Sequence, residues 1–344
     1  MVITAHGPTM GETTMPLNAY GVLSARVIDI RRETGDTPHY QIHLGDNENR
    51  HYRAAVNVES SQQPSDLLYF AVDNFQHPLT TALPPAGSGW NKLASQPGAA
   101  ALDYIRANIV TREQMRPVPP DAEGPNNDLA DFLDHYVRRA QQDPTATAYL
   151  YGEPWGPEDT PDKIFGFTPG AGVHNVHMNQ GNSEQFQQDN GVWQDGGMLL
   201  HFAGENRWVA VFLAFQTQSW HTDDETGHPL PAEGITEDGT IRVVAAMVNP
   251  VGGGRENETI TLLNTADHTI DLTGWSLADT HKNTMPLPVR DIAAGQTLQI
   301  PATGEFHLGN DGGQITVLDP RGNKIHGVTY TAANAATEGR TVQF

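Results

Sequence analysis

The chain has 344 residues, 38% of them hydrophobic and 18% charged, and it contains no cysteine. This length favours two domains, and the lack of cysteine excludes disulfides, thiolate metal sites and cysteine nucleophiles. Of the net charge of −21, residues 241–344 account for −3 (7 basic against 10 acidic residues), so −18 falls on residues 1–240. Such an acidic surface disfavours nonspecific binding to nucleic acid or anionic membranes.

Residues 1–14 are expected to form a flexible leader. They lack the basic segment and apolar run of a secretory signal. No stretch approaches the roughly 18 apolar residues that would span a bilayer. We therefore predict no membrane span and a cytoplasmic location, and leave open an export route that needs no leader.

The segment from residue 15 to 228 is expected to form an α+β domain. Alternating apolar and polar residues predict a strand over 20–30, and a turn-rich centre predicts a hairpin over 39–60. Helical spacing of apolar residues predicts helices over 99–110 and from about 126 to 141. The most apolar strand, 207–220, is apolar on both faces through Phe215 and should be central in its sheet.

Residues 229–240 are rich in proline, glycine and acidic residues and are predicted to be a linker. Short alternating strands without a helix signal follow over 241–344, a length that suits a β-sandwich. Its expected core includes Ile260, Leu262, Leu272 and Trp275. The fold class is thus mainly β with some α.

Three sequence features of 241–344 resemble those of a lamin-tail domain, an immunoglobulin-like sandwich. They are Asn249-Pro250, Gly274-Trp275 and Leu308-Gly309-Asn310. In bacteria such domains are often appended to other modules, including hydrolases. The resemblance implies an attachment role toward a protein or polar-ligand partner, which the sequence does not identify.

Residues 15–228 resemble the YukJ-like bacterial proteins, a family of unknown function. The resemblance rests on segments that include MPLNAYGVL (15–23), DNFQHP (73–78), GVHNVHMNQGN (172–182) and FLAFQTQSWHTDD (212–224). It implies no activity, so function must be argued from candidate sites.

The first candidate site is HNVHMNQGN (174–182). As a strand it would place Asn175, His177 and Asn179 on one face, with His177 as the acid/base and the amides, including Gln180, orienting a substrate or water. As a helical turn it would let His174 and His177 share a metal. The alternative is a structural turn whose histidines hold backbone groups.

Further candidate site residues lie on either side of the centre of the apolar strand predicted over 207–220. His221 and Asp223 are potential metal ligands, although their spacing matches no zinc signature and a solvated turn is the simpler interpretation. Gln216 and Gln218 are candidate substrate-binding residues where the strand becomes polar. Asp195, before two glycines, is a candidate general base or simply a turn residue.

Two functions compete at this point. The first is a hydrolase, with metal-assisted phosphodiester cleavage as the candidate reaction, in which His174, His177, His221 and Asp223 hold zinc, manganese or magnesium. The second is a non-catalytic protein that binds a glycan or peptide or serves as a scaffold. The sequence lacks a G-x-S-x-G elbow, a Walker loop and a Rossmann fingerprint.

Overall fold

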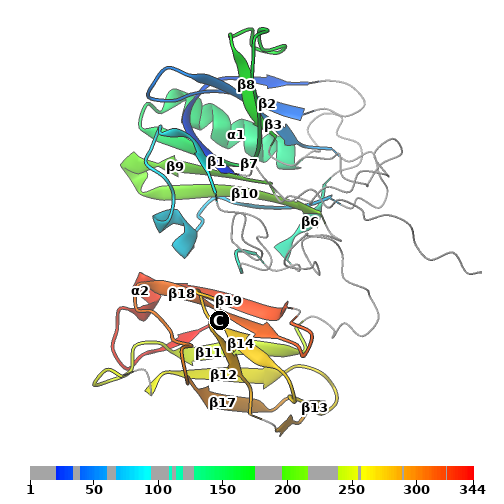
Figure 1. Cartoon of the computed structure of the whole chain (residues 1–344), viewed down its shortest axis with the longest axis vertical. Coiled ribbons are helices and arrows are strands. Elements are labelled where there is room, and N and C mark those ends of the chain that lie inside the picture. Colours follow the sequence, from blue (N-terminus) through cyan, green and yellow to red (C-terminus); the bar gives the residue numbers. More distant parts are fainter. Residues whose placement is uncertain are drawn as a thin grey trace, which may run out of the picture.

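The computed structural model places two β-rich parts, each with its own hydrophobic core, one above the other along the longest axis (Figure 1). The residues that it describes are 21–33, 39–59, 67–93, 108–110, 114–118, 128–174, 196–215, 239–254, 257–288, 290–322 and 324–344.

The first part is built on a single sheet. Its strands are β1 (Gly21–Arg32), β2 (His39–Gly45), β3 (His51–Asn57), β4 (Leu67–Val72), β5 (Gly89–Lys92), β6 (Arg116–Pro117), β7 (Ala146–Glu158), β8 (Gly170–His174), β9 (Gly196–Phe202) and β10 (Arg207–Phe215). They run in the order β5-β1-β2-β3-β8-β7-β9-β10-β4-β6. Among these pairs only β3 and β8 are parallel. Short 3-10 helices, η1 (Pro78–Thr81) and η5 (Ala203–Glu205), follow β4 and β9.

Two long strands close part of this sheet on itself. The first half of β1 pairs with β7, from Gly21 opposite Gly152, and its second half pairs with β2 up to Arg32 opposite Tyr40. β7 in turn passes from β1 and β9 to β8. Strands β1, β2, β3, β8 and β7 therefore form a closed hydrogen-bonded ring.

The helix α1 (Asp128–Gln142) packs its apolar side into this core. Leu129, Leu133 and Val137 are fully buried at helical spacing, as the sequence predicts. Asp128 and Asp131 lie in the first turn and Arg139 in the last, where each charge suits the helix dipole.

The second part is a sandwich of two four-stranded antiparallel sheets. Its strands are β11 (Ile241–Met247), β12 (Thr259–Asn264), β13 (Ile270–Asp271), β14 (Ser276–Ala278), β15 (Thr284–Pro286), β16 (Asp291–Ile292), β17 (Thr297–Pro301), β18 (Gly312–Leu318), β19 (Lys324–Thr331) and β20 (Thr341–Gln343). The sheet orders are β17-β12-β11-β20 and β15-β14-β18-β19, with β13 and β16 forming a separate pair.

The sandwich core is the one expected from the sequence. Ile260, Leu262, Leu272 and Trp275 are all buried in it. One element was not expected, the single helical turn α2 (Ala332–Ala335), which begins with a capping box between Thr331 and Asn334.

The predicted elements of the first part are largely confirmed. The strand over 20–30 is β1, the hairpin over 39–60 is β2 and β3, and β10 lies between β9 and β4 with both faces buried from Val209 to Leu213. The helix predicted over 99–110 lies outside the described residues except for its end. There, residues 108–110 are not helical, and Asn108 has a left-handed φ of 64°.

The described residues contain no helix that combines the length and the apolar character needed to cross a membrane.

Candidate functional site

Most of the predicted site residues lie outside the part of the chain that the structure describes. These are Asn175, His177, Asn179, Gln180, Asp195, Gln216, Gln218, His221 and Asp223. Only the backbone of His174 is described, at the end of β8 between Ala55 of β3 and Glu153 of β7. The shared site that the hydrolase hypothesis requires, with His174 and His177 beside His221 and Asp223, stays a prediction. Within the described residues, no group of three or more His, Asp or Glu side chains could hold a metal ion.

A buried ion pair fixes the strand that leads to His174. Arg53 Nε of β3 donates to Asp162 Oδ2 at 2.7 Å, and Arg53 Nη1 donates to Gln41 Oε1 at 2.9 Å. Asp162 also accepts the backbone N–H of Phe165, and these bonds keep the pKa of its carboxyl low against the effect of burial. The pair ties β3 to the loop between β7 and β8, so β8 ends on a firmly held part of the sheet.

The described residues form a distinct polar pocket where the two parts of the protein meet. It has a volume of about 330 Å³, within the range of small-molecule sites. Figure 1 shows β18, β19 and α2 on the side of the sandwich that faces the first part. The lining residues are Asn74, Phe75, Gln76, His77, Pro78, Thr80, Thr81, Asn206, Trp208, Asp311, Thr331, Ala332 and Ala333.

One wall is the extended segment after β4. Its side chains alternate, with Asn74 and Gln76 exposed and Phe75 and His77 buried. The segment is held at its start by Arg207, whose Nη2 donates to Asp73 Oδ2 at 3.0 Å and whose Nε donates to the Asp73 carbonyl at 2.7 Å. The two exposed amides are therefore presented from a fixed backbone.

His77 is the buried imidazole of the pocket. Its Nδ1 accepts the backbone N–H of Leu79 at 3.0 Å and so caps η1. Since Nδ1 accepts, the neutral ring carries its proton on Nε2, which is buried. Burial lowers the pKa of His77 to about 4, partly opposed by the Asn108 carbonyl. His77 is therefore a neutral donor at physiological pH.

Trp208 supplies an aromatic wall. Its ring stacks on His201, the residue opposite it on β9, with centroids 4.1 Å apart and planes within 10°. Its backbone carbonyl accepts the N–H of Phe75 at 2.9 Å, and this bond joins Trp208 to the extended segment after β4. Asn206, beside it, takes a left-handed φ of 47°, a conformation that asparagine tolerates.

The sandwich closes the pocket with Asp311, Thr331 and the start of α2. Gly312 allows this approach, because a Cβ on it would lie 3.3 Å from Pro78 Cγ and its φ is +108°. A second contact lies nearby, where Asn108 Nδ2 donates to the Thr316 hydroxyl at 2.7 Å and to the Ile315 carbonyl at 3.3 Å.

The pocket suits an uncharged polar ligand. Its described lining includes no Lys or Arg, and Asp311 is its only acidic residue, so the site does not match a phosphate group. Amides, hydroxyls, one carboxylate and a tryptophan ring instead match a ligand with many hydroxyl groups and an apolar face.

Sequence reasoning did not find this pocket. The residues come from segments more than 200 positions apart, such as Gln76 and Asp311, and no local pattern links them. The available signal was the alternation in DNFQHP (73–78), where polar residues alternate with Phe75 and His77 outside a predicted strand.

Comparison with known proteins divides the chain in the same way. A family profile described as "Uncharacterized conserved protein (DUF2278)" matches residues 15–227, and one described as "Lamin Tail Domain" matches residues 236–332. The chain is 46% identical over 219 residues to "Uncharacterized protein YukJ" of Bacillus subtilis (strain 168), which covers 63% of this chain and 96% of that protein.

Proposed function

Since the chain belongs to the DUF2278 family of uncharacterized conserved proteins, its function has to be inferred from its own surfaces, and we propose that it binds a neutral glycan at the junction of its two parts. The observation that carries the proposal is the composition of the junction pocket. Asn74, Gln76 and Asp311 can pair with sugar hydroxyls, and Trp208 offers an apolar ring.

The buried imidazole supports the same ligand class. The His77 ring lines the pocket and is uncharged at physiological pH, because burial lowers the pKa of His77 to about 4. A neutral wall of this kind suits a neutral ligand and offers no charge to an anion. Because both parts of the protein contribute residues, ligand binding should also hold them together.

The experiment is a glycan array probed with the full chain, followed by calorimetry with the glycan that is retained. Asp311→Ala should weaken binding about tenfold or more, because a charge-assisted hydrogen bond is lost. Asp159→Ala is the matched control, since Asp159 is also exposed and lies away from the pocket. Retention of no glycan, or equal affinities for the two variants, would refute the proposal.

A metal-assisted hydrolase is the second proposal, and the observation that favours it is the firmly held end of β8. His174 leaves the sheet next to the strand that the Arg53–Asp162 pair fixes, so the following residues start from a rigid base, as catalytic groups require. His174, His177, His221 and Asp223 would hold zinc, manganese or magnesium. Metal analysis of protein purified without a His tag tests this directly.

A further inference from the structure

Among the described strands, β20, the last strand of the sandwich, has a neighbour on one side only. β20 ends the order β17-β12-β11-β20 among the described strands. On its inner side the N–H of Phe344 donates to the Val244 carbonyl at 3.1 Å. Because such bonds alternate along an antiparallel pair, Val342 also faces β11, and the N–H and C=O groups of Thr341 and Gln343 face outward.

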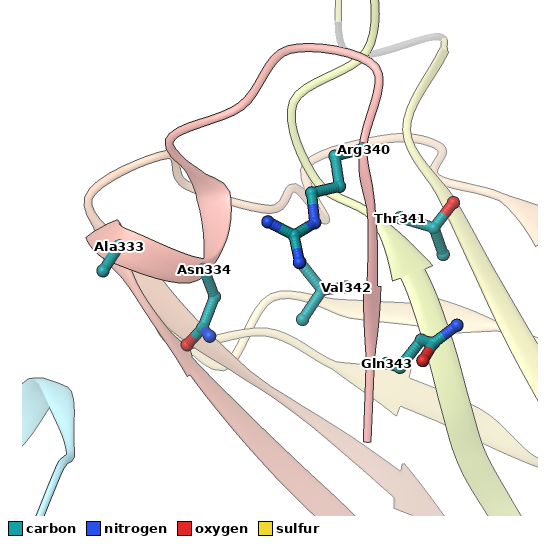
Figure 2. Close-up of a pocket in the computed structure, with 6 residues that line it drawn as sticks. All are labelled: Ala333, Asn334, Arg340, Thr341, Val342 and Gln343. Atoms are coloured by element: carbon teal, nitrogen blue, oxygen red, sulfur yellow. The ribbon is translucent and has the colours of Figure 1, made fainter.

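A polar cavity of about 520 Å³ lies beside this edge, lined by Ala333, Asn334, Arg340, Thr341, Val342 and Gln343. Figure 2 shows the Arg340 side chain between β20 and α2, pointing toward Asn334. Its guanidinium has no carboxylate partner among the described residues. The nearest acidic residue in sequence, Glu338, instead accepts the N–H of Gly252 at 2.7 Å.

Exposed apolar side chains flank the same edge. The large hydrophobic residues that are most exposed in the described structure are Val251, at 72%, and Phe344, at 39%. Phe344 directly follows β20. Val251 lies against Gly339, one residue before Arg340, since a Cβ on Gly339 would be 2.7 Å from Val251 Cγ2. We call the free strand with Arg340, Val251 and Phe344 the β20 edge.

We propose that the β20 edge binds an extended, acidic peptide segment of a partner protein by strand addition. The outward groups of Thr341 and Gln343 would supply main-chain hydrogen bonds, and Arg340 would pair with a carboxylate of the peptide. Apolar peptide residues at either end would cover Val251 and Phe344. The cavity beside the β20 edge shares only Ala333 of α2 with the lining of the glycan pocket.

A second copy of the chain fits this edge less well. Residues 340–344 of a copy read Arg-Thr-Val-Gln-Phe and offer no carboxylate side chain to Arg340. An extended acidic peptide can pair a carboxylate with the Arg340 guanidinium and can also form main-chain hydrogen bonds with β20. Exposed edges of this kind pair readily with extended chains.

Fluorescence anisotropy of the full chain tests the proposal with a labelled probe peptide, Thr-Val-Glu-Val-Glu-Val-Thr. We expect saturable binding, at least tenfold weaker for the peptide with lysine in place of both glutamates. A probe that is N-methylated at every residue should not bind, because neither of its edges can then donate hydrogen bonds to β20. Arg340→Gln should reduce affinity about tenfold and remove the preference for acid.

The protein-side control exploits the direction of the backbone groups. Gln343→Pro removes an outward N–H and leaves the bonds to β11, so it should abolish probe binding without unfolding the sandwich. Arg321→Gln, a charge removal elsewhere on the sandwich, should leave the affinity unchanged. Three results would overturn the proposal: no saturable binding of the acidic probe, equal binding of the N-methylated probe, or a dimer in sedimentation that Gln343→Pro dissociates.

Discussion

The Asn108 side-chain nitrogen of the first part lies 2.7 Å from the Thr316 hydroxyl of the sandwich. Thr316 is directly opposite Gly327 in the β18–β19 pair, and a Cβ on Gly327 would lie 1.8 Å from Asn108 Oδ1. Asn108 therefore enters the sandwich surface at a position that only glycine leaves open. This contact holds the two walls of the junction pocket together.

Gly327→Ala should separate the two parts without unfolding either. Gly327 has an ordinary strand conformation, so alanine suits the backbone of β19, and the three atoms nearest to its Cβ would all belong to Asn108. We expect a larger radius of gyration by small-angle X-ray scattering and loss of glycan binding. Adding Asn108→Gly removes the clashing side chain and suits the left-handed φ of 64°, so the double variant should be compact again. An unchanged scattering profile for the single variant would contradict this account.

The buried imidazole should make stability depend on pH. The pKa of His77 is lowered to about 4 in the folded protein, whereas an unfolded histidine titrates near 6.5. Its contribution is therefore fully present above pH 6.5 and is lost as the pH falls toward 4, by on the order of 3 kcal/mol. An NMR titration of His77 should show a midpoint near 4.

His77→Asn provides the control for that pH dependence. Asparagine can still cap η1 but does not titrate, so the free energy of unfolding should fall less steeply between pH 6.5 and 4. Some slope should remain, since burial also lowers the pKa values of His39, His43 and His201. Equal slopes for the two proteins would show that His77 does not contribute.

The sandwich should fold alone when it begins at Gly239. The Gly239 N–H donates to the Ile325 carbonyl at 2.7 Å, and the Thr265 backbone N–H donates to the Thr240 carbonyl at 2.9 Å. A fragment of residues 239–344 should give well-dispersed amide signals, and one starting at residue 241 should be less stable. Trp275→Ala should cost roughly 3–5 kcal/mol, because Trp275 is only 4% exposed. Collapsed signals from the longer fragment would reject autonomous folding.

The hydrolase proposal predicts a specific loss of metal. His177→Ala and His221→Ala should each lower the bound metal by at least tenfold in affinity, because each removes one ligand. His268→Ala is the matched control, since His268 is exposed on the sandwich and pairs only with Asp267 among the described residues. Equal metal content in all three variants would exclude metal binding by His177 and His221. A role of His177 as a general acid or base would remain possible without a metal.

Local patterns predicted most of the fold. The apolar stripe of α1, the hairpin around Gly45 and the buried β10 follow from periodicities of 3.6 and 2, which the burial of side chains enforces. The region around Asn108 escaped prediction, because its left-handed backbone serves a contact with Thr316, more than 200 positions away. The junction pocket could not be predicted either, because its residues are also far apart in the sequence.

The division of β1 between two partners has a consequence for synthesis of the chain. The hairpin of β2 and β3 can form as soon as it leaves the ribosome, but Gly21 has to wait for Gly152, and β3 for Gly172 of β8. At about 5–20 residues per second, these waits are roughly 6–26 s. Throughout it the nascent chain carries unpaired apolar strands, so we expect its yield to depend on chaperones that shield them.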